Sequence, residues 1–227
     1  MEYAIADGAA ANAAKALGKE ADYRHFNNMS HSYRIFFDKE RGFVRGVDDK
    51  GNFREPFNPY FAAHRADDYC EGNAWQYTWL VPHDMEGYAA MFGGKERCIA
   101  RLDSLFLAPS ALEGDPSPDM SGMIGQYVHG NEPSHHILYL YALLGQPHKT
   151  AQWVREVMDR LYSSTPDGYC GDEDNGQTSA WYVFSALGFY PVCPGSGEYA
   201  IGTPLFERAV VHLENGKTIE VKADGDG

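Results

Sequence analysis

A glycine-broken polar loop that runs directly into an apolar helix constrains the fold of this chain more than any other stretch. The loop spans residues 125–136, and Pro133 fits the first turn of a helix, where its missing N–H costs nothing. Asn131 and Glu132 therefore lie at or beside a helix N-terminus, where the helix dipole favours a carboxylate. The same geometry can hold a cation or a sugar hydroxyl. In the alternative, Glu132 only caps the helix, which is worth about 1 kcal/mol, and the histidines of the loop are hydrogen-bonded core residues.

The composition is that of a folded domain with an acidic balance. The chain has 227 residues, of which 44% are hydrophobic, enough for one large domain or for one domain and a small appendage. Its net charge of -13 argues against nucleic acid and anionic membranes as partners, because both require clustered Lys and Arg. The four cysteines are far apart without C-x-x-C spacing, so we expect no zinc site made of them.

The two ends of the chain suggest a piece of a longer protein. No run approaches the ~20 apolar residues of a membrane span, and the first residues lack the basic start of a signal peptide. The chain opens inside an alanine-rich helical pattern and stops just after a strand-like segment. We therefore expect further sequence in the parent protein, and the residues themselves assign no compartment.

Helical periodicity dominates the chain up to about residue 194. Apolar spacings predict a helical hairpin from residues 1–18 and 23–37, followed by a small β-hairpin and an irregular excursion over 38–60. A further helix is predicted after Gly72, and residues 108–124 are predicted to be loop. The remaining predicted helices cover residues 83–93, 98–106, 137–144, 150–161 and the stretch that ends at Gly188.

These elements predict a mainly α fold with a short β-rich tail. About seven or eight helices in antiparallel succession suit part of an α/α toroid, whose loops at one end converge on a funnel. From about residue 195 the pattern becomes strand-like, and Asn215-Gly216 between two alternating runs is a strong hairpin signal. We therefore divide the chain into a partial toroid, residues 1–194, and a β-rich C-terminal segment, residues 195–227, that packs on it.

A second acidic segment precedes a tryptophan-rich helix. Glu71 stands before Gly72 on a loop at a helix start, with Trp75, Gln76 and Trp79 on the turns behind it. A carboxyl group among tryptophans is partly desolvated, which raises its pKa by disfavouring the charged form. A general acid that works near neutral pH needs such a shift. In the alternative, the segment is only another capped helix with an aromatic core.

A third acidic segment, residues 171–182, leads into a buried helix. Asp172, Glu173 and Asp174 are consecutive, and Asp174 with Gln177 fits a capping box, so Asp174 could serve only the helix. A cap does not explain Asp172, because neighbouring carboxylates are costly unless a cation, a water network or a proton is shared. All three acidic segments lie on loops that enter helices, which is consistent with one shared end of a toroid.

Five motifs distributed along the chain carry a family resemblance. They are EGNAWQYTW (71–79), VPHD (81–84), HGNEPSHH (129–136), GDEDNGQ (171–177) and SAWYVFSALGFYPV (179–192). Together they closely resemble glycoside hydrolase family 92, whose members are exo-acting, calcium-dependent α-mannosidases. The resemblance implies an (α/α)6 catalytic domain, of which this chain is the C-terminal part. In the family, an N-terminal β-sandwich precedes this domain, and strands that follow it pack back.

The resemblance also implies catalytic roles for the acidic residues. The family hydrolyses terminal α-mannosides with inversion, which needs two carboxyl groups roughly 6.5–9.5 Å apart with room for a water molecule. On this sequence Glu71 is the expected general acid and Asp174 the expected general base, with Asp172 assisting. Glu132 is the alternative acid.

A calcium ion in the family grips the 2- and 3-hydroxyls of the sugar and helps to distort its ring. Calcium prefers carboxylate, amide and carbonyl oxygens. Gln126, Asn131 and Glu132 are therefore the expected ligands. The sugar-contacting or ligand-supporting residues expected from the motifs are His129, His135, His136, Trp75 and Gln177.

The function implied by the resemblance is that of a fragment of an exo-α-mannosidase, with an α-1,2 preference expected, that acts on mannose-containing glycans. Family members are several times larger than this chain and are usually exported by bacteria. We expect little or no activity from this piece without the β-sandwich and the first toroid helices. Two alternatives remain: a non-catalytic fragment that binds calcium and mannose, and another α/α-toroid glycosidase acting on glucosides.

Overall fold

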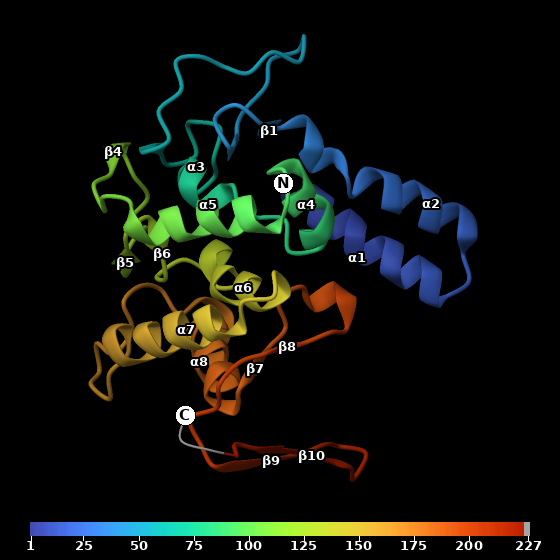
Figure 1. The fold of residues 1–227 in the computed structure, drawn as a ribbon, viewed down its shortest axis with the longest axis vertical. Helices are drawn as coiled ribbons and strands as arrows, with labels where there is room; N and C mark the ends of the chain where they lie inside the picture. The colour runs from blue at the N-terminus through green and yellow to red at the C-terminus, as the bar shows by residue number, and fades with distance from the viewer. Residues whose placement is uncertain (225–227) are drawn as a thin grey trace.

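The computed structural model describes residues 1–224 as a helical body decorated by two-stranded ribbons (Figure 1). This mainly α architecture confirms the predicted fold class, part of an α/α toroid with a small β segment. The helices, in chain order, are α1 (Glu2–Ala16), α2 (Glu20–Met29), α3 (Ala74–Tyr77), α4 (Met85–Met91), α5 (Lys95–Leu107), α6 (Leu140–Leu143), α7 (Pro147–Leu161) and α8 (Gln177–Leu187).

The predicted N-terminal hairpin is present as α1 and α2, which project from one side of the body (Figure 1). Helix α1 buries only alanines, Ala4, Ala11 and Ala14, whose small side chains let neighbouring segments approach. Helix α2 buries no residue and ends at Met29, so the predicted amphipathic helix over 23–37 is shorter than expected. The chain continues as a 3-10 turn, η1 (Ser32–Ile35), in which Tyr33 is the residue that reaches the core.

Large aromatic side chains fill the core. The fully buried aromatic residues are Tyr33, Trp79, Tyr88, Tyr127, Tyr139, Tyr141 and Trp181. Buried tyrosine hydroxyls need partners, and Tyr33 donates to Asp84 Oδ2 at 2.7 Å while Tyr141 donates to Asp103 Oδ1 at 2.8 Å. The high aromatic content of the sequence is therefore explained to a large extent by packing.

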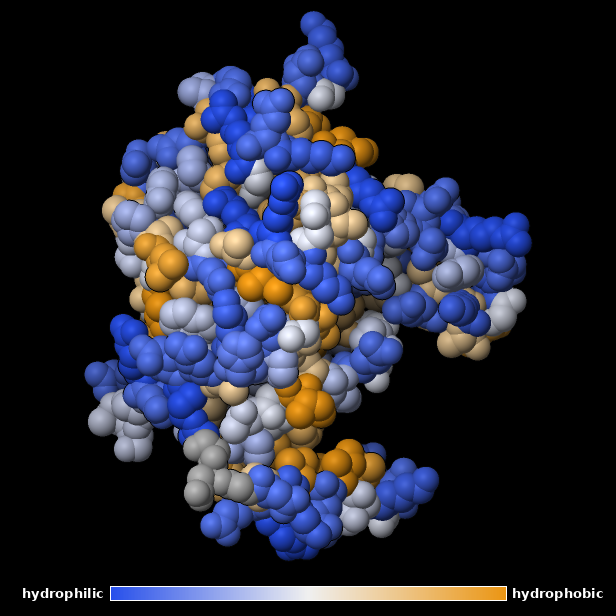
Figure 2. Space-filling model, viewed as in Figure 1, coloured by the Kyte–Doolittle hydropathy of each residue, from blue (hydrophilic) through white to orange (hydrophobic). Residues whose placement is uncertain are grey.

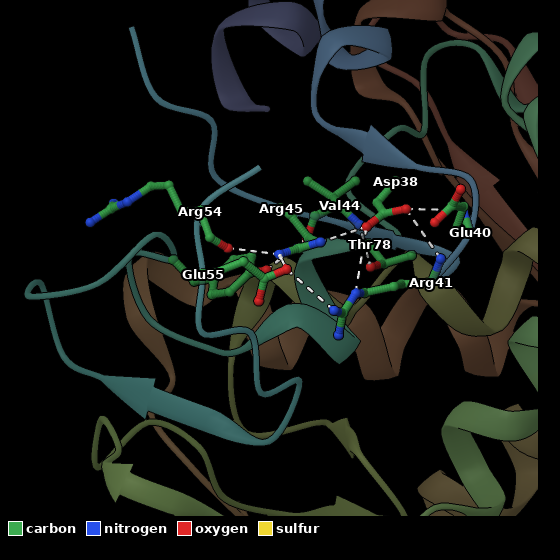
Figure 3. Close-up of polar contacts among 9 residues, drawn as sticks. Asp38, Glu40, Arg41, Val44, Arg45, Arg54, Glu55 and Thr78 are labelled. Atoms are coloured by element: carbon green, nitrogen blue, oxygen red, sulfur yellow. Dashed lines mark hydrogen bonds and ion pairs between the residues drawn. The ribbon is translucent and has the colours of Figure 1, made fainter. Parts of the chain in front are cut away.

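The predicted β-hairpin after η1 is present as β1 (Phe37–Asp38) and β2 (Phe43–Val44). Figure 3 shows how the following excursion is attached: Arg45, 3% exposed, donates to Asp38 Oδ2 at 2.6 Å and to Glu55 Oε1 at 2.8 Å. The Arg45 guanidinium also lies 4.4 Å from the centroid of the Phe57 ring. Because a buried charge without its partner costs several kcal/mol, this network holds residues 45–57 against the body.

Two further two-stranded ribbons lie beside α3 and α5. One strand of each lies within residues 108–124, which were predicted to be loop. Strand β3 (Phe61–Ala63) pairs in parallel with β4 (Glu113–Asp115), and β5 (Met123–Ile124) pairs with β6 (Tyr127–Val128). The turn of the second ribbon contains Gly125, whose φ of 60° favours glycine. Through this turn the chain enters the polar loop of residues 125–136.

The C-terminal segment is only partly in contact with the helices. Strand β7 (Phe189–Tyr190) pairs with β8 (Ala200–Ile201), and Leu205 N donates to Ala186 O at 2.9 Å, so this part contacts α8. The predicted Asn-Gly hairpin is present as β9 (Arg208–His212) and β10 (Thr218–Lys222).

The β9–β10 hairpin stands apart from the helical body and buries none of its residues (Figure 1). Figure 2 shows apolar surface along its edge toward the body. The expected packing of the whole C-terminal segment on the toroid stays a prediction. Within residues 1–224, no helix is both long and apolar enough to cross a bilayer.

Candidate active site

Side-chain amides join the first acidic segment to the central loop. Asn73 caps α3, because its Oδ1 accepts from Trp75 N at 2.9 Å, and its Nδ2 donates to Gln126 Oε1 at 3.0 Å. Gln76 Nε2 donates to Gln126 O at 2.6 Å. Asn131 Nδ2 donates to Glu71 O at 2.9 Å. The backbone next to Glu71 is thus tied directly to the residue that precedes Glu132.

Two glycines bring the third acidic segment against the central loop. A Cβ on Gly171 would lie 2.4 Å from Gly130 O, and one on Gly130 would lie 3.1 Å from Gly171 Cα. Only glycine lets the two backbones approach this closely. Beyond them, Trp181 Nε1 donates to His135 O at 3.0 Å, so α8 is also fixed to the central loop. The three acidic segments therefore share one framework.

The three histidines of the central loop are buried within this framework. His129 lies between the hydroxyls of Tyr127 and Tyr162, each 2.7 Å from a ring nitrogen. His136 Nε2 lies 2.7 Å from Trp79 O. All three are buried, and this burial lowers their pKa, to about 4 for His135 and His136, so they are neutral at physiological pH. In this chain the ring nitrogens of the three histidines contact groups of the framework, and the expected roles of His129, His135 and His136 as sugar-contacting or ligand-supporting residues stay predictions.

Gln126 and Trp75 also serve the framework. Gln126 is fully buried; its Oε1 accepts from Asn73, and its Nε2 donates to Pro109 O at 2.6 Å and Ala111 O at 3.0 Å. Its side-chain oxygen accepts one hydrogen bond, and its expected role as a calcium ligand stays a prediction. Trp75 packs on Phe43 with ring centroids 5.0 Å apart and is buried, and its expected part in the sugar pocket stays a prediction.

Gln177, the last predicted sugar contact, is half-buried at the start of α8. Its Nε2 donates to Tyr190 OH at 3.1 Å and lies 3.3 Å from His135 Nδ1. Its amide nitrogen is thus directed at the framework.

Two of the predicted catalytic acids, Asp174 and Glu132, cap no helix. Glu173, not Asp174, caps α8: its Oε2 accepts from Gly176 N at 2.9 Å and its Oε1 from Ser179 N at 3.1 Å. The capping-box alternative for Asp174 is therefore wrong. At the central loop the helix is a three-residue 3-10 turn, η2 (Glu132–Ser134), without a side-chain cap. So short a turn has little dipole, and the cap reading of Glu132 also fails.

Burial sets the protonation of the two glutamates. Desolvation raises the pKa of Glu71, and the negative charge of Asp119 raises it further. Desolvation also raises the pKa of Glu132, as do the nearby charges of Asp174, Glu71 and Asp172. The negative charges of the first and third acidic segments therefore act on Glu132, which lies on the central loop between them. Glu132 Oε1 is buried and has no hydrogen-bond partner among the described residues.

The aspartates of the third segment are more exposed than the glutamates. Asp172 and Asp174 both face solvent, and a hydrogen bond to Asp119 is the main cause that raises the pKa of Asp172. In the part of the chain that the structure describes, no Lys or Arg pairs with these acids. This holds for Glu71, Asp119, Glu132, Asp172 and Asp174.

Two residues near the site were not predicted from sequence. Asp119 raises the pKa of Asp172 and, through its negative charge, that of Glu71, and it lies on the segment that was predicted to be plain loop. His64 follows β3, and its charge, when present, lowers the pKa of Glu71. The sequence signal for His64 was its position just before the aspartates that lead to Glu71. The sequence signal for Asp119 was the glycines that follow it.

A comparison with protein-family models identifies the family to which this site belongs. The model of the glycosyl hydrolase family 92 catalytic domain matches residues 1–227. The chain belongs to this family. It is thus a glycosidase-family chain, as the sequence motifs indicated.

Solved structures of the family share the fold across the whole chain. The chain is similar to the family GH92 α-mannosidase BT3965 from Bacteroides thetaiotaomicron in complex with mannoimidazole, with 46% identity and a TM-score of 0.91. The match covers 100% of this chain and 30% of that one. The inverting mannosidase BT2199 from the same organism is 45% identical, with a TM-score of 0.83 over 99% of this chain and 31% of its own.

A match to a curated relative covers similar shares of the two chains. An uncharacterized secreted glycosidase of Arthroderma benhamiae is 27% identical over 243 residues, which cover 98% of this chain and 29% of that protein. The chain therefore spans somewhat less than a third of the length of the relatives that it matches.

The residues present fit calcium better than a metal that prefers nitrogen or sulfur. Among residues 1–224, no three His, Cys, Asp or Glu side chains form a set that could hold a metal. Calcium takes about 6–8 oxygen ligands, many of them amides, carbonyls, waters and hydroxyls. The buried, unpaired Oε1 of Glu132 next to the amide of Asn131 suits such an ion.

Proposed function

We propose that this chain carries the acid and the base of an inverting, calcium-dependent exo-α-mannosidase that removes terminal mannose from α-1,2-linked glycans. One observation carries the proposal. The loops that carry Glu71, Glu132 and Asp174 are joined to one another, these acids have no Lys or Arg partner among residues 1–224, and the side chains of Asn73 and Glu173 do the local helix capping. Carboxyl groups held near one another without positive partners destabilise the folded chain. Their presence therefore supports a catalytic role.

In this proposal Glu71 is the general acid. Burial raises its pKa, which keeps the carboxyl protonated at higher pH than a free glutamate. The proton passes to the glycosidic oxygen as the bond to the leaving group breaks. Glu132 is the alternative acid, since burial raises its pKa as well.

Asp174 is the proposed general base on the opposite side of the sugar ring. It is exposed, and no side-chain hydrogen bond within the described residues occupies it, so a water molecule can reach it. It removes a proton from this water as the water attacks the anomeric carbon, and Asp172 lies beside it. Inversion requires the acid and base to be about 6.5–9.5 Å apart.

Asn131 and Glu132 would hold the calcium ion, which when bound supplies positive charge to polarise sugar hydroxyls. These residues also bring their own chemistry to the site. Asn131 fixes the backbone at Glu71, and Glu132 adds negative charge that favours a cationic transition state of the sugar.

We further propose that the chain is part of a longer, exported protein and has little or no activity alone. It spans 30% of the length of BT3965. Several large apolar residues are exposed on it, including Leu17 at 71% and Leu107 at 81%, as expected where further chain covers them. The printed name of the curated relative, a secreted glycosidase, supports export.

Aryl glycosides test the proposed function. The parent protein is expected to cleave aryl α-mannosides with kcat of about 1–1,000 per second, to lose this activity with a chelator and to regain it with calcium. Aryl α-glucosides should be cleaved far more slowly. Faster cleavage of the glucosides, or full activity in chelator, would contradict the proposal, and an enzyme-like rate from residues 1–227 alone would contradict the need for the missing parts.

A further inference from the structure

Two residues of the framework each follow an acid of the proposed site by three positions and bind its backbone. His135 N donates to Glu132 O at 3.0 Å at the end of η2. Gln177 N donates to the backbone carbonyl of Asp174 at the end of η4 (Asp174–Gly176). The backbones of the two acids are therefore each tied, through one hydrogen bond, to a residue whose own side chain faces the framework.

The side chains of His135 and Gln177 contact each other. His135 Nε2 lies 3.0 Å from His129 O, and because a carbonyl oxygen only accepts, this nitrogen carries the ring proton. Nδ1 of the neutral ring is then an acceptor, and Gln177 Nε2 donates to it at 3.3 Å. The same amide nitrogen also donates to Tyr190 OH at 3.1 Å. Both contacts use N–H donors of Gln177, which fixes the orientation of its amide group.

Both ends of this contact are held by packed surroundings. His135 is 1% exposed, and Trp181 Nε1 on α8 donates to its carbonyl at 3.0 Å. Tyr190 is buried and stacks on Tyr139, with ring centroids 4.8 Å apart. Movement of either partner would leave buried polar groups without hydrogen bonds, which costs free energy. The contact therefore joins the central loop to the start of α8 at a fixed separation.

We propose that His135 and Gln177 are positioning residues whose side-chain hydrogen bond sets the distance between the central loop and the base, Asp174. Inversion requires the base to hold a water molecule at the correct distance from the sugar and from the acid. Neither positioning residue exchanges a proton in the reaction, and both act through the backbone of the acids that they follow. The inference rests on the proposed function for its effect on catalysis, whereas the hydrogen bond stands by itself.

Two substitutions of His135 in the parent protein separate its two hydrogen bonds. His135→Gln can still donate to His129 O but offers no acceptor at the position of Nδ1. His135→Asn keeps an acceptor near that position for Gln177 and loses the bond to His129 O. We expect kcat to fall by about 10- to 100-fold with His135→Gln, as a misplaced base implies, and by less than about 3-fold with His135→Asn. KM should change by less than about 2-fold in both variants, because the base acts in the transition state.

A double-mutant cycle tests the contact itself. Gln177→Met keeps the length of the side chain, removes both N–H donors, and should lower kcat as His135→Gln does. In the Gln177→Met background, His135→Gln should change kcat by less than about 2-fold, because the contact is already lost. His148→Gln is the matched control, since this exposed histidine on the first turn of α7 lies outside the proposed machinery. Its rate should stay within about 2-fold of the wild type.

Equal rates of His135→Gln and His135→Asn would overturn the inference, because a histidine that serves only packing gives the asparagine variant no advantage. Effects of His135→Gln and Gln177→Met that simply multiply would also overturn it. If neither His135 variant folds, Gln177→Met decides alone, since this position is half-buried. A wild-type kcat would then refute the role, and a lowered kcat with unchanged KM would support it.

The failure of the proposed function gives a different result from the failure of this inference. If the parent cleaves no α-mannoside, the proposed function fails, and the same cycle is measured on the free energy of unfolding. Additive effects of His135→Gln and Gln177→Met there would refute the contact, and non-additive effects would support it.

Discussion

Asp174→Asn is expected to reduce the kcat of the parent protein on aryl α-mannosides by about 1,000-fold, within the range of general acid–base catalysis. Asparagine has nearly the same shape but cannot accept a proton from the attacking water. Because Asp174 does not cap α8, the substitution removes no structural hydrogen bond among the described residues. Rates from steady-state assays and mannose affinity from isothermal titration measure the two effects, and affinity should remain largely intact.

The control for this substitution is Asp167→Asn, an exposed acid on the turn that precedes the same segment. It should leave kcat within about 2-fold of the wild type, as surface substitutions usually do. A parent in which Asp174→Asn retains its rate would contradict the assignment of the base. A parent that binds mannose without cleaving any mannoside would favour the non-catalytic alternative.

Glu71→Gln is expected to lower kcat/KM by about 100- to 10,000-fold on a mannose disaccharide, whose leaving group needs a proton. On an aryl mannoside with a very acidic leaving group, the loss should be small, because such a group departs without protonation. The ratio of the two losses is the signature of a general acid. A structural defect would reduce both rates equally.

Glu132→Gln separates the two candidates for the acid. If Glu71 is the acid, Glu132→Gln should reduce the rates on both substrates by similar factors and weaken the response to calcium, because Glu132 is a proposed ligand. If the dependence on the leaving group appears with Glu132→Gln and not with Glu71→Gln, the assignment of Glu71 is wrong.

Local chemistry explains the parts of the fold that were predictable from sequence. The β9–β10 hairpin follows from Asn215-Gly216, whose glycine takes a φ of 79°. The acidic segments lie on loops before helices because Gly72, Pro133 and Gly176 mark those boundaries. Such signals act over a few residues and need no knowledge of the rest of the chain.

The direction of each polar side chain was less predictable, because it depends on distant partners. His136 could face a pocket or the core, and the carbonyl of Trp79, far away in sequence, decides for the core. The capping box of Asp174 fails for a conformational reason. Asn175 and Gly176 take φ angles of 55° and 84°, which move the helix start to Gln177 and leave Glu173 as the cap.

The glutamates and aspartates that neither cap a helix nor pair with Lys or Arg are the basis of the proposed mechanism. Glycines at positions 130 and 171 permit the loops to meet, yet the sequence alone does not pair them. The effect of Asp119 on the pKa of Asp172 was hidden in the same way, because the residues lie far apart along the chain.

The anomeric form of the first product tests the central claim most directly. Proton NMR of an α-mannoside digested by the parent protein should show β-mannose before any α-mannose, since water attacks from the side opposite the leaving group. Appearance of α-mannose first would mean that a carboxylate attacks the sugar and that Glu71 and Asp174 do not act as the acid and base of an inverting enzyme.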